Sequence, residues 1–322
     1  MVELEDIWLA HRRLERVAVH TPLVLCPRSV TKRLLYFKPE SFQPVGSFKL
    51  RGAYNKIASL SEEQKGCGVI AYSSGNHAQG VAYAALKLGV RATIVMPESA
   101  SKVKLARTKE LGAEIVRVGA GSEERRPRAE EIADERGYAL VSPYDDEALI
   151  AGQGTVGLEV LEDLPDVETV LVPVGGGGLI SGVAAALKLS RPQVQVFGVE
   201  PELAADAQAS MRSGRMVELP SEQVGRTIAD GLRAQHLGDL TFAYIRRFVD
   251  GIVTVSEDEI VDATRRLAYE AHLVAEPSGA VAFAGYLYRR SELPSTHLNV
   301  AIVSGGNVEP DLLAQILAVS DR

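Results

Sequence analysis

The chain has 322 residues, of which 46% are hydrophobic and 24% are charged, so its composition is globular and excludes a disordered chain. The formal net charge of −7 argues against a general nucleic-acid-binding protein, and two cysteines are too few for a disulfide scaffold. The first residues are acidic and lack the layout of a signal peptide, and the sequence has no uninterrupted apolar run long enough to span a membrane. We therefore expect a soluble cytoplasmic protein with neither a membrane nor a nucleic acid as its partner.

Short β-branched runs alternate with longer runs rich in alanine and leucine, which predicts βα units around parallel sheets. The predicted strands are Gly68–Tyr72, Ala92–Met96, Glu114–Val118, Thr169–Val174, Gln195–Val199 and Asn299–Val303. The predicted helices are His77–Leu88, Ser101–Leu111, Ala129–Arg136, Gly152–Leu161, Leu179–Leu189 and Asp258–Ala271. The charged segment Gly119–Arg128 is expected to be a solvated connection that leads into a helix. This pattern predicts an α/β fold with two closely packed lobes.

The first candidate for chemistry is Lys49, which lies between Phe48 and Leu50 in the segment GSFKLRG. A lone lysine at a helix start is usually solvated. Burial between apolar neighbours would instead lower the pKa of the amine and make it a nucleophile. Taken alone, the segment leaves both interpretations open.

The second candidate is Ser73–Gly80, with the sequence SSGNHAQG, between a predicted strand and a predicted helix. These residues could simply form a turn and a helix N-cap. They could also form an anion site, because short hydroxyls and backbone N–H groups converge at a helix start. His77 by itself is more often structural than catalytic.

Two glycine-rich segments follow later strands. Gly175–Gly178 is a run of four glycines, costly for a mere turn, whose bare backbone suits a phosphate. It matches neither a dinucleotide-binding fingerprint nor a P-loop. Ser304 opens the segment SGGN after the last predicted strand, where it is either part of a turn or a ligand-facing hydroxyl. Together with Lys49, these features suit pyridoxal phosphate, which needs a lysine, a phosphate cradle and a partner for its ring nitrogen.

Five segments in series carry a family resemblance: GSFKLRGA, SSGNHAQG, AGQGT (Ala151–Thr155), PVGGGGL and SGGN. From about Leu14 to Asn307 the chain resembles the fold type II pyridoxal-phosphate enzymes, and most closely their serine/threonine dehydratase and serine racemase family. The resemblance implies a two-lobed fold like that of the tryptophan synthase β subunit, each lobe a mostly parallel sheet flanked by helices. A large pyridoxal-phosphate-binding domain would comprise residues 1–67 and 144–322, and a small domain, residues 68–143, would carry the substrate loop. Members of the family are usually homodimers.

The resemblance also implies roles for individual residues. Lys49 would form the Schiff base with pyridoxal phosphate, while the other cofactor-binding residues would be Phe48, Asn76, Gly175, Gly176, Gly177, Gly178, Leu179 and Ser304. Asn76 would bond the ring hydroxyl, the glycines and Leu179 the phosphate, and Ser304 the ring nitrogen. The carboxylate of an amino-acid substrate would be bound by Ser73, Ser74, Asn76 and His77.

A metal site is implied by the segment from Glu200 to Asp206, EPELAAD. It resembles a racemase segment in which a Glu, a backbone carbonyl and an Asp bind Mg²⁺ or Ca²⁺. Here the ligands would be Glu200, Ala204 and Asp206, oxygen donors that suit a hard cation. Without the resemblance, acidic residues after a strand would be taken as solvated.

The implied reaction is that of an L-serine/L-threonine dehydratase (ammonia-lyase). Lys49 takes the α-proton, the β-hydroxyl is lost as water, and hydrolysis gives a 2-oxo acid and ammonia. Ser74 supports an alternative, because racemases of the family read SSGNH where dehydratases often read SAGNH. A serine opposite the lysine provides a second acid–base group, so Ser74 would be catalytic in a serine racemase with side dehydratase activity.

The segment from Ser142 to Asp146, SPYDD, leaves the substrate open. It resembles the HPFDD stretch of the dehydratases but departs from it at Ser142 and Tyr144. A dehydratase for another β-hydroxy amino acid, such as threo-3-hydroxyaspartate or a hydroxyectoine-derived compound, is a further alternative, with Arg125 a candidate for its extra group. A non-catalytic phosphate-binding protein would lack Lys49, and β-replacement enzymes usually have a threonine-rich phosphate loop. Because the chain ends soon after Ser304, we do not expect feedback through a C-terminal regulatory domain.

Overall fold

The computed structural model describes residues 1–27, 32–100, 102–119 and 124–318. Ser101, the first residue of a predicted helix, and residues 120–123 of the charged segment lie outside the described residues. The described chain forms a six-stranded sheet of order β1-β2-β10-β7-β8-β9 and a four-stranded sheet of order β5-β4-β3-β6. Neighbouring strands of both sheets are parallel except β1 and β2, which are antiparallel.

All six predicted strands are confirmed, with ends within two residues of the prediction. The six-stranded sheet comprises β1 (Val24–Leu25), β2 (Leu34–Pro39), β7 (Thr169–Pro173), β8 (Gln195–Pro201), β9 (Gly251–Val255) and β10 (Leu298–Val303). The four-stranded sheet comprises β3 (Val69–Tyr72), β4 (Ala92–Pro97), β5 (Glu114–Val118) and β6 (Ala139–Leu140). The predicted start at Gly68 is one residue early, because Gly68 has φ +122° and ψ 179°, outside the strand conformation. The strands β1, β2, β6 and β9 were not predicted.

Helices cover both faces of the six-stranded sheet, as expected for parallel strands. One face packs against α1 (Leu4–Leu14), α7 (Glu147–Asp163), α8 (Gly178–Ser190) and α11 (Asp239–Phe248), and the other against α12 (Glu257–Glu270) and α13 (Pro277–Tyr288). Side chains of β7 alternate between these layers, so that Val170 and Val172 belong to the first core and Leu171 to the second.

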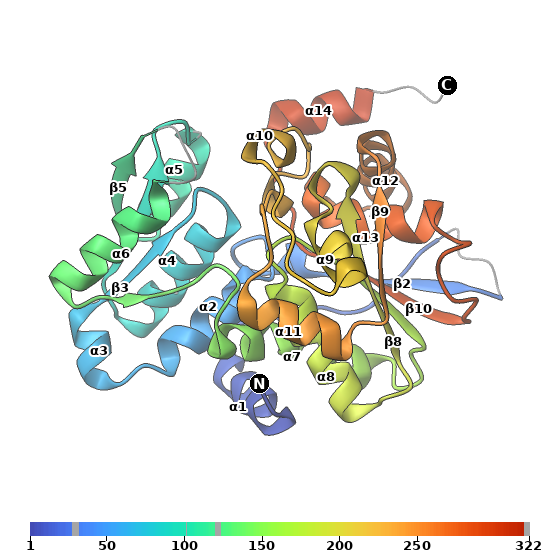
Figure 1. Ribbon diagram of the computed structural model, residues 1–322, viewed down its shortest axis with the longest axis horizontal. Helices are drawn as coiled ribbons and strands as arrows, with labels where there is room; N and C mark the ends of the chain where they lie inside the picture. Colours follow the sequence, from blue (N-terminus) through green and yellow to red (C-terminus); the bar gives the residue numbers. More distant parts are fainter. Residues whose placement is uncertain (28–31, 101, 120–123, 319–322) are drawn as a thin grey trace.

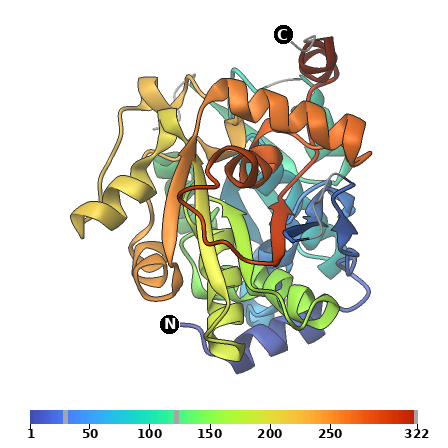
Figure 2. The ribbon, with the colours of Figure 1, turned by 90° about the vertical axis from the view of Figure 1, so that its right-hand side faces the viewer.

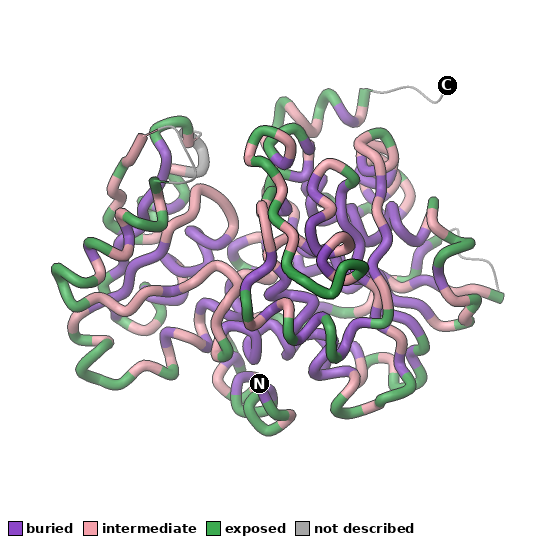
Figure 3. Tube along the Cα trace, in the orientation of Figure 1, coloured by how far each residue is buried: buried purple, intermediate pink, exposed green. Residues whose placement is uncertain are grey.

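The four-stranded sheet forms the smaller body seen on the left of Figure 1. Its two faces are covered by α4 (Asn76–Leu88) and by α6 (Arg125–Arg136). Around them lie α3 (Glu62–Cys67) and α5 (Lys102–Glu110). Burial follows the same division, with the buried chain in Figure 3 concentrated inside each body and exposed residues on the outer helices.

The helix α2 (Lys49–Ala58) lies between the two bodies. Ala53 and Ile57 belong to the core of the four-stranded sheet together with residues of α4. On its other side α2 packs against α7, where an added Cβ at Gly152 would lie 2.6 Å from the carbonyl oxygen of Arg51. Both bodies therefore fix the position of α2.

Local signals explain where several helices begin and end. The Asp146 carboxylate accepts a hydrogen bond from the N–H of Leu149, so α7 begins five residues before the predicted Gly152. Left-handed glycines, Gly89 and Gly137, end α4 and α6. The helix α13 was not predicted, because it is buried on all sides and so has no amphipathic pattern.

Short elements complete the described fold. They are α9 (Asp206–Ser213), α10 (Ser221–Val224), α14 (Pro310–Ala318) and the 3-10 turns η1 (Glu40–Phe42), η2 (Glu202–Ala204) and η3 (Asp230–Leu232). In the view of Figure 2, turned by 90° from Figure 1, the helices on both faces of the larger sheet can be followed. None of the described helices is both long and apolar enough to cross a membrane.

Candidate active site

A cavity of about 340 Å³ lies where segments of both bodies meet. Its lining includes the segments that follow β3, β7 and β10, so it occupies the carboxyl ends of parallel strands. Every residue predicted for the cofactor or the substrate lines it: Phe48, Lys49, Ser73, Ser74, Asn76, His77, Gly175, Gly176, Gly177, Gly178, Leu179 and Ser304. The volume falls within the range of small-molecule and cofactor sites.

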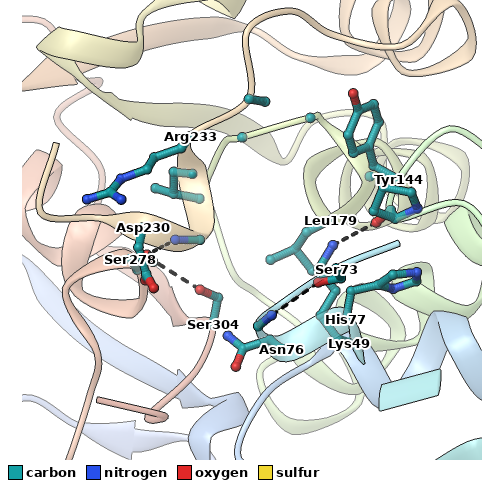
Figure 4. Close-up of a pocket in the computed structure, with 18 of the residues that line it drawn as sticks. Lys49, Ser73, Asn76, His77, Tyr144, Leu179, Asp230, Arg233, Ser278 and Ser304 are labelled. Carbon is teal, nitrogen blue, oxygen red and sulfur yellow. Dashed lines mark hydrogen bonds between the residues drawn. The ribbon is translucent and has the colours of Figure 1, made fainter. Parts of the chain in front are cut away.

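Lys49 is the first residue of α2, and its side chain reaches toward the segment that precedes α7 (Figure 4). Its Nζ donates a hydrogen bond to the carbonyl oxygen of Pro143 at 2.6 Å and lies 5.2 Å from the centre of the Phe48 ring. Burial lowers the pKa of the Lys49 amine to about 8. The unprotonated fraction of this amine near neutral pH is therefore far larger than that of an exposed lysine, and a nucleophile or a base acts in this form.

The loop between β3 and α4 carries the predicted substrate residues. The Ser73 hydroxyl oxygen accepts a hydrogen bond from the N–H of Gly75 at 3.2 Å, which folds the loop back toward α4. Asn76 begins α4; its amide nitrogen donates to Glu276 at 2.6 Å and its amide oxygen accepts from Asn307 at 2.8 Å. The asparagine thus connects this loop to the segments around α13 and β10.

His77 is buried, and its Nε2 lies 2.9 Å from the carbonyl oxygen of Val141. Since a carbonyl only accepts, Nε2 carries the proton. Burial, together with the charge of Lys49, lowers the pKa of His77 to about 3, so the ring is neutral near neutral pH. Its contact with the main chain supports the structural interpretation, and its role in substrate binding stays a prediction.

The glycine run connects β7 to α8. An added Cβ at Gly176 would lie 2.1 Å from the ring of Tyr144, and one at Gly177 would lie 2.8 Å from Thr241. Gly177 also has a positive φ of +88°. Glycine is therefore required at both positions. The loop leads directly into α8, whose first N–H groups have no partner inside the helix and form the positive end of its dipole. This geometry suits a phosphate.

Tyr144 and Asp145 support this loop from outside. The Tyr144 ring covers Gly176, and burial raises the pKa of its hydroxyl to about 12. Oδ1 of Asp145 accepts hydrogen bonds from the N–H groups of Leu240 and Thr241, at 3.0 and 3.1 Å, and so caps α11. Thr241 in turn donates through Oγ1 to the carbonyl oxygen of Gly176 at 2.9 Å.

Ser304 lies across the pocket from Tyr144 in Figure 4. It is buried directly after β10, and its hydroxyl donates to the carbonyl oxygen of Ser278 at 3.5 Å. Ser278 Oγ accepts from the N–H of Gly231 at 2.9 Å. A hydroxyl here can face a ring nitrogen without supplying a charge.

Several lining residues were not predicted from the sequence as site residues: Glu276, Ser278 and the segment Asp230–His236. Glu276 and Ser278 lie at the start of α13, where Pro277 is the first helical residue. The sequence Glu276-Pro277-Ser278 predicts the start of a helix but gives no sign of a ligand-binding site. The segment Asp230–His236 offers neither a glycine run nor a charge pattern that would have marked it.

The predicted metal residues do not line this pocket. Glu200 is the second-last residue of β8. Its two carboxylate oxygens accept hydrogen bonds from the N–H groups of Ala207 and Gln208, at 3.0 and 2.8 Å. Both carboxylate oxygens of Asp206 are buried without a hydrogen-bond partner. Ala204, two residues earlier in the chain, is fully buried.

Burial raises the pKa of the Glu200 carboxyl well above its usual value, and the nearby Asp206 adds to the rise. Burial also raises the pKa of Asp206 to about 7. Burying two carboxylates without a positively charged partner costs free energy, and a divalent cation bound by both would offset that cost. Among the described residues no group of three or more His, Cys, Asp or Glu could hold a metal, so main-chain carbonyls or water would have to complete the ligand set.

The fold is that of a known family. Residues 15–305 match the family of pyridoxal-phosphate dependent enzymes, and the chain belongs to it. It is 46% identical to an L-threonine ammonia-lyase of Thermotoga maritima over 98% of this chain and 78% of that one. It is 45% identical to an L-threo-3-hydroxyaspartate ammonia-lyase of Saccharomyces cerevisiae, over 97% of this chain and 95% of that one. A solved structure of maize serine racemase superposes with a TM-score of 0.93 at 39% identity, covering 98% of this chain and 96% of that one.

These relatives confirm the predicted family and the two-lobed type II fold. They also confirm that the chain is a pyridoxal-phosphate-dependent enzyme, in a group whose members are named as ammonia-lyases and racemases.

Proposed function

We propose that this protein is an L-serine/L-threonine dehydratase, which removes water from a β-hydroxy amino acid and releases a 2-oxo acid and ammonia. The observation that supports it best is the pocket itself. It brings the Lys49 amine, with its lowered pKa, together with a glycine phosphate loop and the uncharged Ser304 hydroxyl. The relatives named as ammonia-lyases support the same reaction class.

The residues present fit pyridoxal phosphate. The backbone of Gly175–Gly178 and Leu179 would hold its phosphate at the start of α8, and Ser304 would face its ring nitrogen. Phe48 would pack near the ring, Asn76 would bond the ring hydroxyl and Lys49 would attach covalently. When bound, the cofactor withdraws electrons from the α carbon of the substrate.

The chain itself then supplies positioning and proton transfer. The loop of Ser73, Ser74, Asn76 and His77, at the start of α4, binds the substrate carboxylate through N–H groups and hydroxyls. The Lys49 amine removes the α-proton. The β-hydroxyl leaves with a proton as water, and hydrolysis of the carbon–nitrogen bond gives the 2-oxo acid and ammonia.

The test is a turnover assay on the purified protein with L-serine, D-serine, L-threonine and L-threo-3-hydroxyaspartate. Release of 2-oxo acid and the chirality of the remaining amino acid are measured separately. We expect fast 2-oxo acid release from L-serine and L-threonine, and none in Lys49→Ala, which should also lose the visible absorption band of the attached cofactor. A wild-type protein that binds the cofactor but releases no 2-oxo acid from either amino acid would overturn the proposal.

A second substrate, threo-3-hydroxyaspartate, is favoured by Arg125. This half-buried arginine lines the pocket close to Tyr72, its Nε has no hydrogen-bond partner, and burial lowers its pKa. A second carboxylate on the substrate would pair with such a guanidinium. The 45% identity to the yeast L-threo-3-hydroxyaspartate ammonia-lyase, over 97% of this chain, supports this alternative.

Arg125→Met separates the two substrates. If the arginine binds a β-carboxylate, the variant loses about 10²-fold or more in kcat/KM on threo-3-hydroxyaspartate while keeping its activity on L-serine, because a buried charge-assisted pair is lost. Equal losses on both substrates would contradict this role.

Ser74 distinguishes a dehydratase from a racemase. It lines the pocket at the start of α4, and as an acid–base group opposite Lys49 it would allow the enantiomers of serine to interconvert. Ser74→Ala should abolish any D-serine formation while 2-oxo acid release from L-serine survives. Racemisation that persists in Ser74→Ala would exclude Ser74 as the second base.

Four further predictions belong with this proposal. Mg²⁺ or Ca²⁺ would bind Glu200, the Ala204 carbonyl and Asp206, with a stabilising or activating role because the reaction needs no metal-bound water. The small domain would span residues 68–143 and the large domain residues 1–67 and 144–322. Gel filtration with light scattering tests the expected homodimer, and cell fractionation tests the expected cytoplasmic location.

A further inference from the structure

Behind the pocket, on the same turn of α2 as Lys49, lies a buried cluster of charges centred on Arg51. Arg51 is completely buried. Its guanidinium donates to both oxygens of Glu40, at 2.7 and 2.9 Å, and to both oxygens of Glu159, at 2.6 and 2.9 Å. It also donates to Thr155 Oγ1 at 3.1 Å and to the carbonyl oxygen of Val19 at 3.2 Å. Each carboxylate accepts two N–H groups in a bidentate ion pair, which is the strongest and most directional geometry available to an arginine.

The side-chain partners of Arg51 come from two other elements of the larger body. Glu40 lies in η1, while Thr155 and Glu159 lie on α7. Thr155 closes the segment AGQGT, to which the proposed reaction gives no role. Close backbone contact accompanies the ion pairs, because an added Cβ at Gly152 would lie 2.6 Å from the carbonyl oxygen of Arg51. The segment therefore holds α7 against the start of α2.

A second buried cation completes the cluster. Lys38, on β2, lies 2.7 Å from Glu159 and donates to the carbonyl oxygen of Thr21 at 2.6 Å. Burial by itself would raise the pKa of Glu159, but Arg51 and Lys38 hold it below its usual value. The carboxylate is therefore ionised, and both cations share it. Only one of the two, Arg51, belongs to the helix that carries Lys49.

The position of α2 matters because its other side packs against α4 of the smaller body. An added Cβ at Gly80 of α4 would lie 3.0 Å from the backbone carbon of Lys49. Arg51 is two residues further along the helix, about 3 Å along its axis, so a shift at Arg51 moves Lys49 almost equally. A buried ion pair adds little net stability compared with apolar residues of the same shape, which favours a geometric role for this one.

We infer that Arg51 is a positioning residue: its double clamp on Glu40 and Glu159 fixes the first turn of α2 and so places the Lys49 amine in the pocket. The inference rests on the proposed function only in that the cofactor attaches to Lys49. It does not depend on which amino acid the enzyme uses.

The test compares Arg51→Lys with Lys38→Met. Arg51→Lys keeps the charge on α2 but cannot form the double fork, whereas Lys38→Met removes the other cation of the same cluster from β2. Three quantities are measured: the rate at which cofactor-free protein attaches pyridoxal phosphate, the visible circular dichroism per attached cofactor, and Tm. For any substrate that is turned over, kcat and KM are added.

We expect Arg51→Lys to slow attachment and lower kcat by about tenfold or more, with an altered dichroism and an unchanged KM, since a misplacement near 1 Å has effects of this size. Lys38→Met should lower Tm and leave attachment and dichroism as in the wild type. Should Arg51→Lys fail to fold, Glu40→Gln takes its place, since it weakens the same clamp while keeping the shape of the side chain, and the same changes are expected.

The inference is overturned if the Arg51 or Glu40 variant lowers only Tm and keeps the attachment rate and dichroism of the wild type. It is also overturned if Lys38→Met changes attachment as strongly as Arg51→Lys, because the cluster would then act as a whole. A wild-type protein that attaches the cofactor but turns over no hydroxy amino acid refutes the proposed function alone, since attachment and dichroism still test the clamp.

Discussion

Lys49 shows how burial changes the chemistry of one residue. Its Nζ is held by a main-chain carbonyl, and among the described residues no carboxylate pairs with it. Burial therefore acts without compensation and lowers the pKa of the amine from 10.5 to about 8.

The stability of the cofactor-free protein should depend on pH for this reason. With a pKa near 8 folded and 10.5 unfolded, the unfolded chain holds more protons between these values, so stability rises as pH increases from about 8 to about 10.5. Chemical unfolding of the cofactor-free protein at several pH values measures this rise. Lys49→Met removes the titrating amine and should remove the corresponding part of the rise. If the pH profiles of the wild type and Lys49→Met are parallel, the amine is not buried as described.

At the residue scale, the sequence predicted the side chains that stand in local motifs. Lys49, the four glycines and Ser304 each follow a pattern that can be read within a few neighbouring residues. Asp145 and Glu276 could not be predicted in their roles, because their partners lie far away in the chain: Asp145 binds the N–H of Thr241, and Glu276 binds Asn76. Such contacts exist only once the fold has formed.

Among the elements, α11 and the glycine loop form a connected unit. Asp145 caps α11, and Thr241 near the start of α11 donates to the carbonyl oxygen of Gly176. Asp145→Ala should lower stability by about 0.5–2 kcal/mol, the usual cost of a lost N-terminal cap, and weaken cofactor binding. Equilibrium unfolding and a titration with pyridoxal phosphate measure the two effects. Asp145→Asn is the matched control, since its amide oxygen still accepts, and its losses should be smaller. Equal losses in both variants would mean that the charge, not the cap, is required.

Gly176 tests the packing of the same loop. An added methyl group would lie 2.1 Å from the Tyr144 ring, so Gly176→Ala should cost about 1–3 kcal/mol through overpacking and lower the affinity for pyridoxal phosphate. Thermal unfolding with and without the cofactor measures both. Adding Tyr144→Ala makes room for the methyl group and should restore part of the cofactor affinity. A double variant as weak as Gly176→Ala would show that the steric contact is not the cause.

At this scale the predicted strands were found because short β-branched runs stand out between longer runs rich in alanine and leucine. β2 was not found, although it pairs with β10 along its whole length in the six-stranded sheet. Its sequence LLYFKP contains a lysine, and only the carboxylate partners from other elements make burial of Lys38 favourable. A reading of periodicity alone cannot supply those partners.

For the whole molecule, the Glu200–Asp206 pair predicts a dependence of stability on divalent cations. A cation that binds only the folded chain raises Tm with its concentration, and EDTA should lower the Tm of protein purified with the metal. Thermal unfolding with Mg²⁺, Ca²⁺ or EDTA measures this. Asp206→Asn should make Tm insensitive to all three additions, while Asp166→Asn, an exposed carboxylate elsewhere, should behave as the wild type. A wild-type Tm that responds to none of them would refute the cation site.

The order of strands in the larger sheet bears on how the protein can be made. β10, the last strand of the described residues, lies between β2 and β7 and pairs with both. During synthesis β1 and β2 therefore cannot join the rest of the sheet until residue 303 has left the ribosome, because β2 reaches β7 only through β10, a pairing of very long sequence separation. The same late strand delivers Ser304 and Gly305, and Gly305 bridges to Ser47 beside the lysine helix. The sheet and the active site are therefore completed together, late in synthesis, and we expect a product of interrupted translation that ends before β10 to be inactive and to expose an unpaired strand edge.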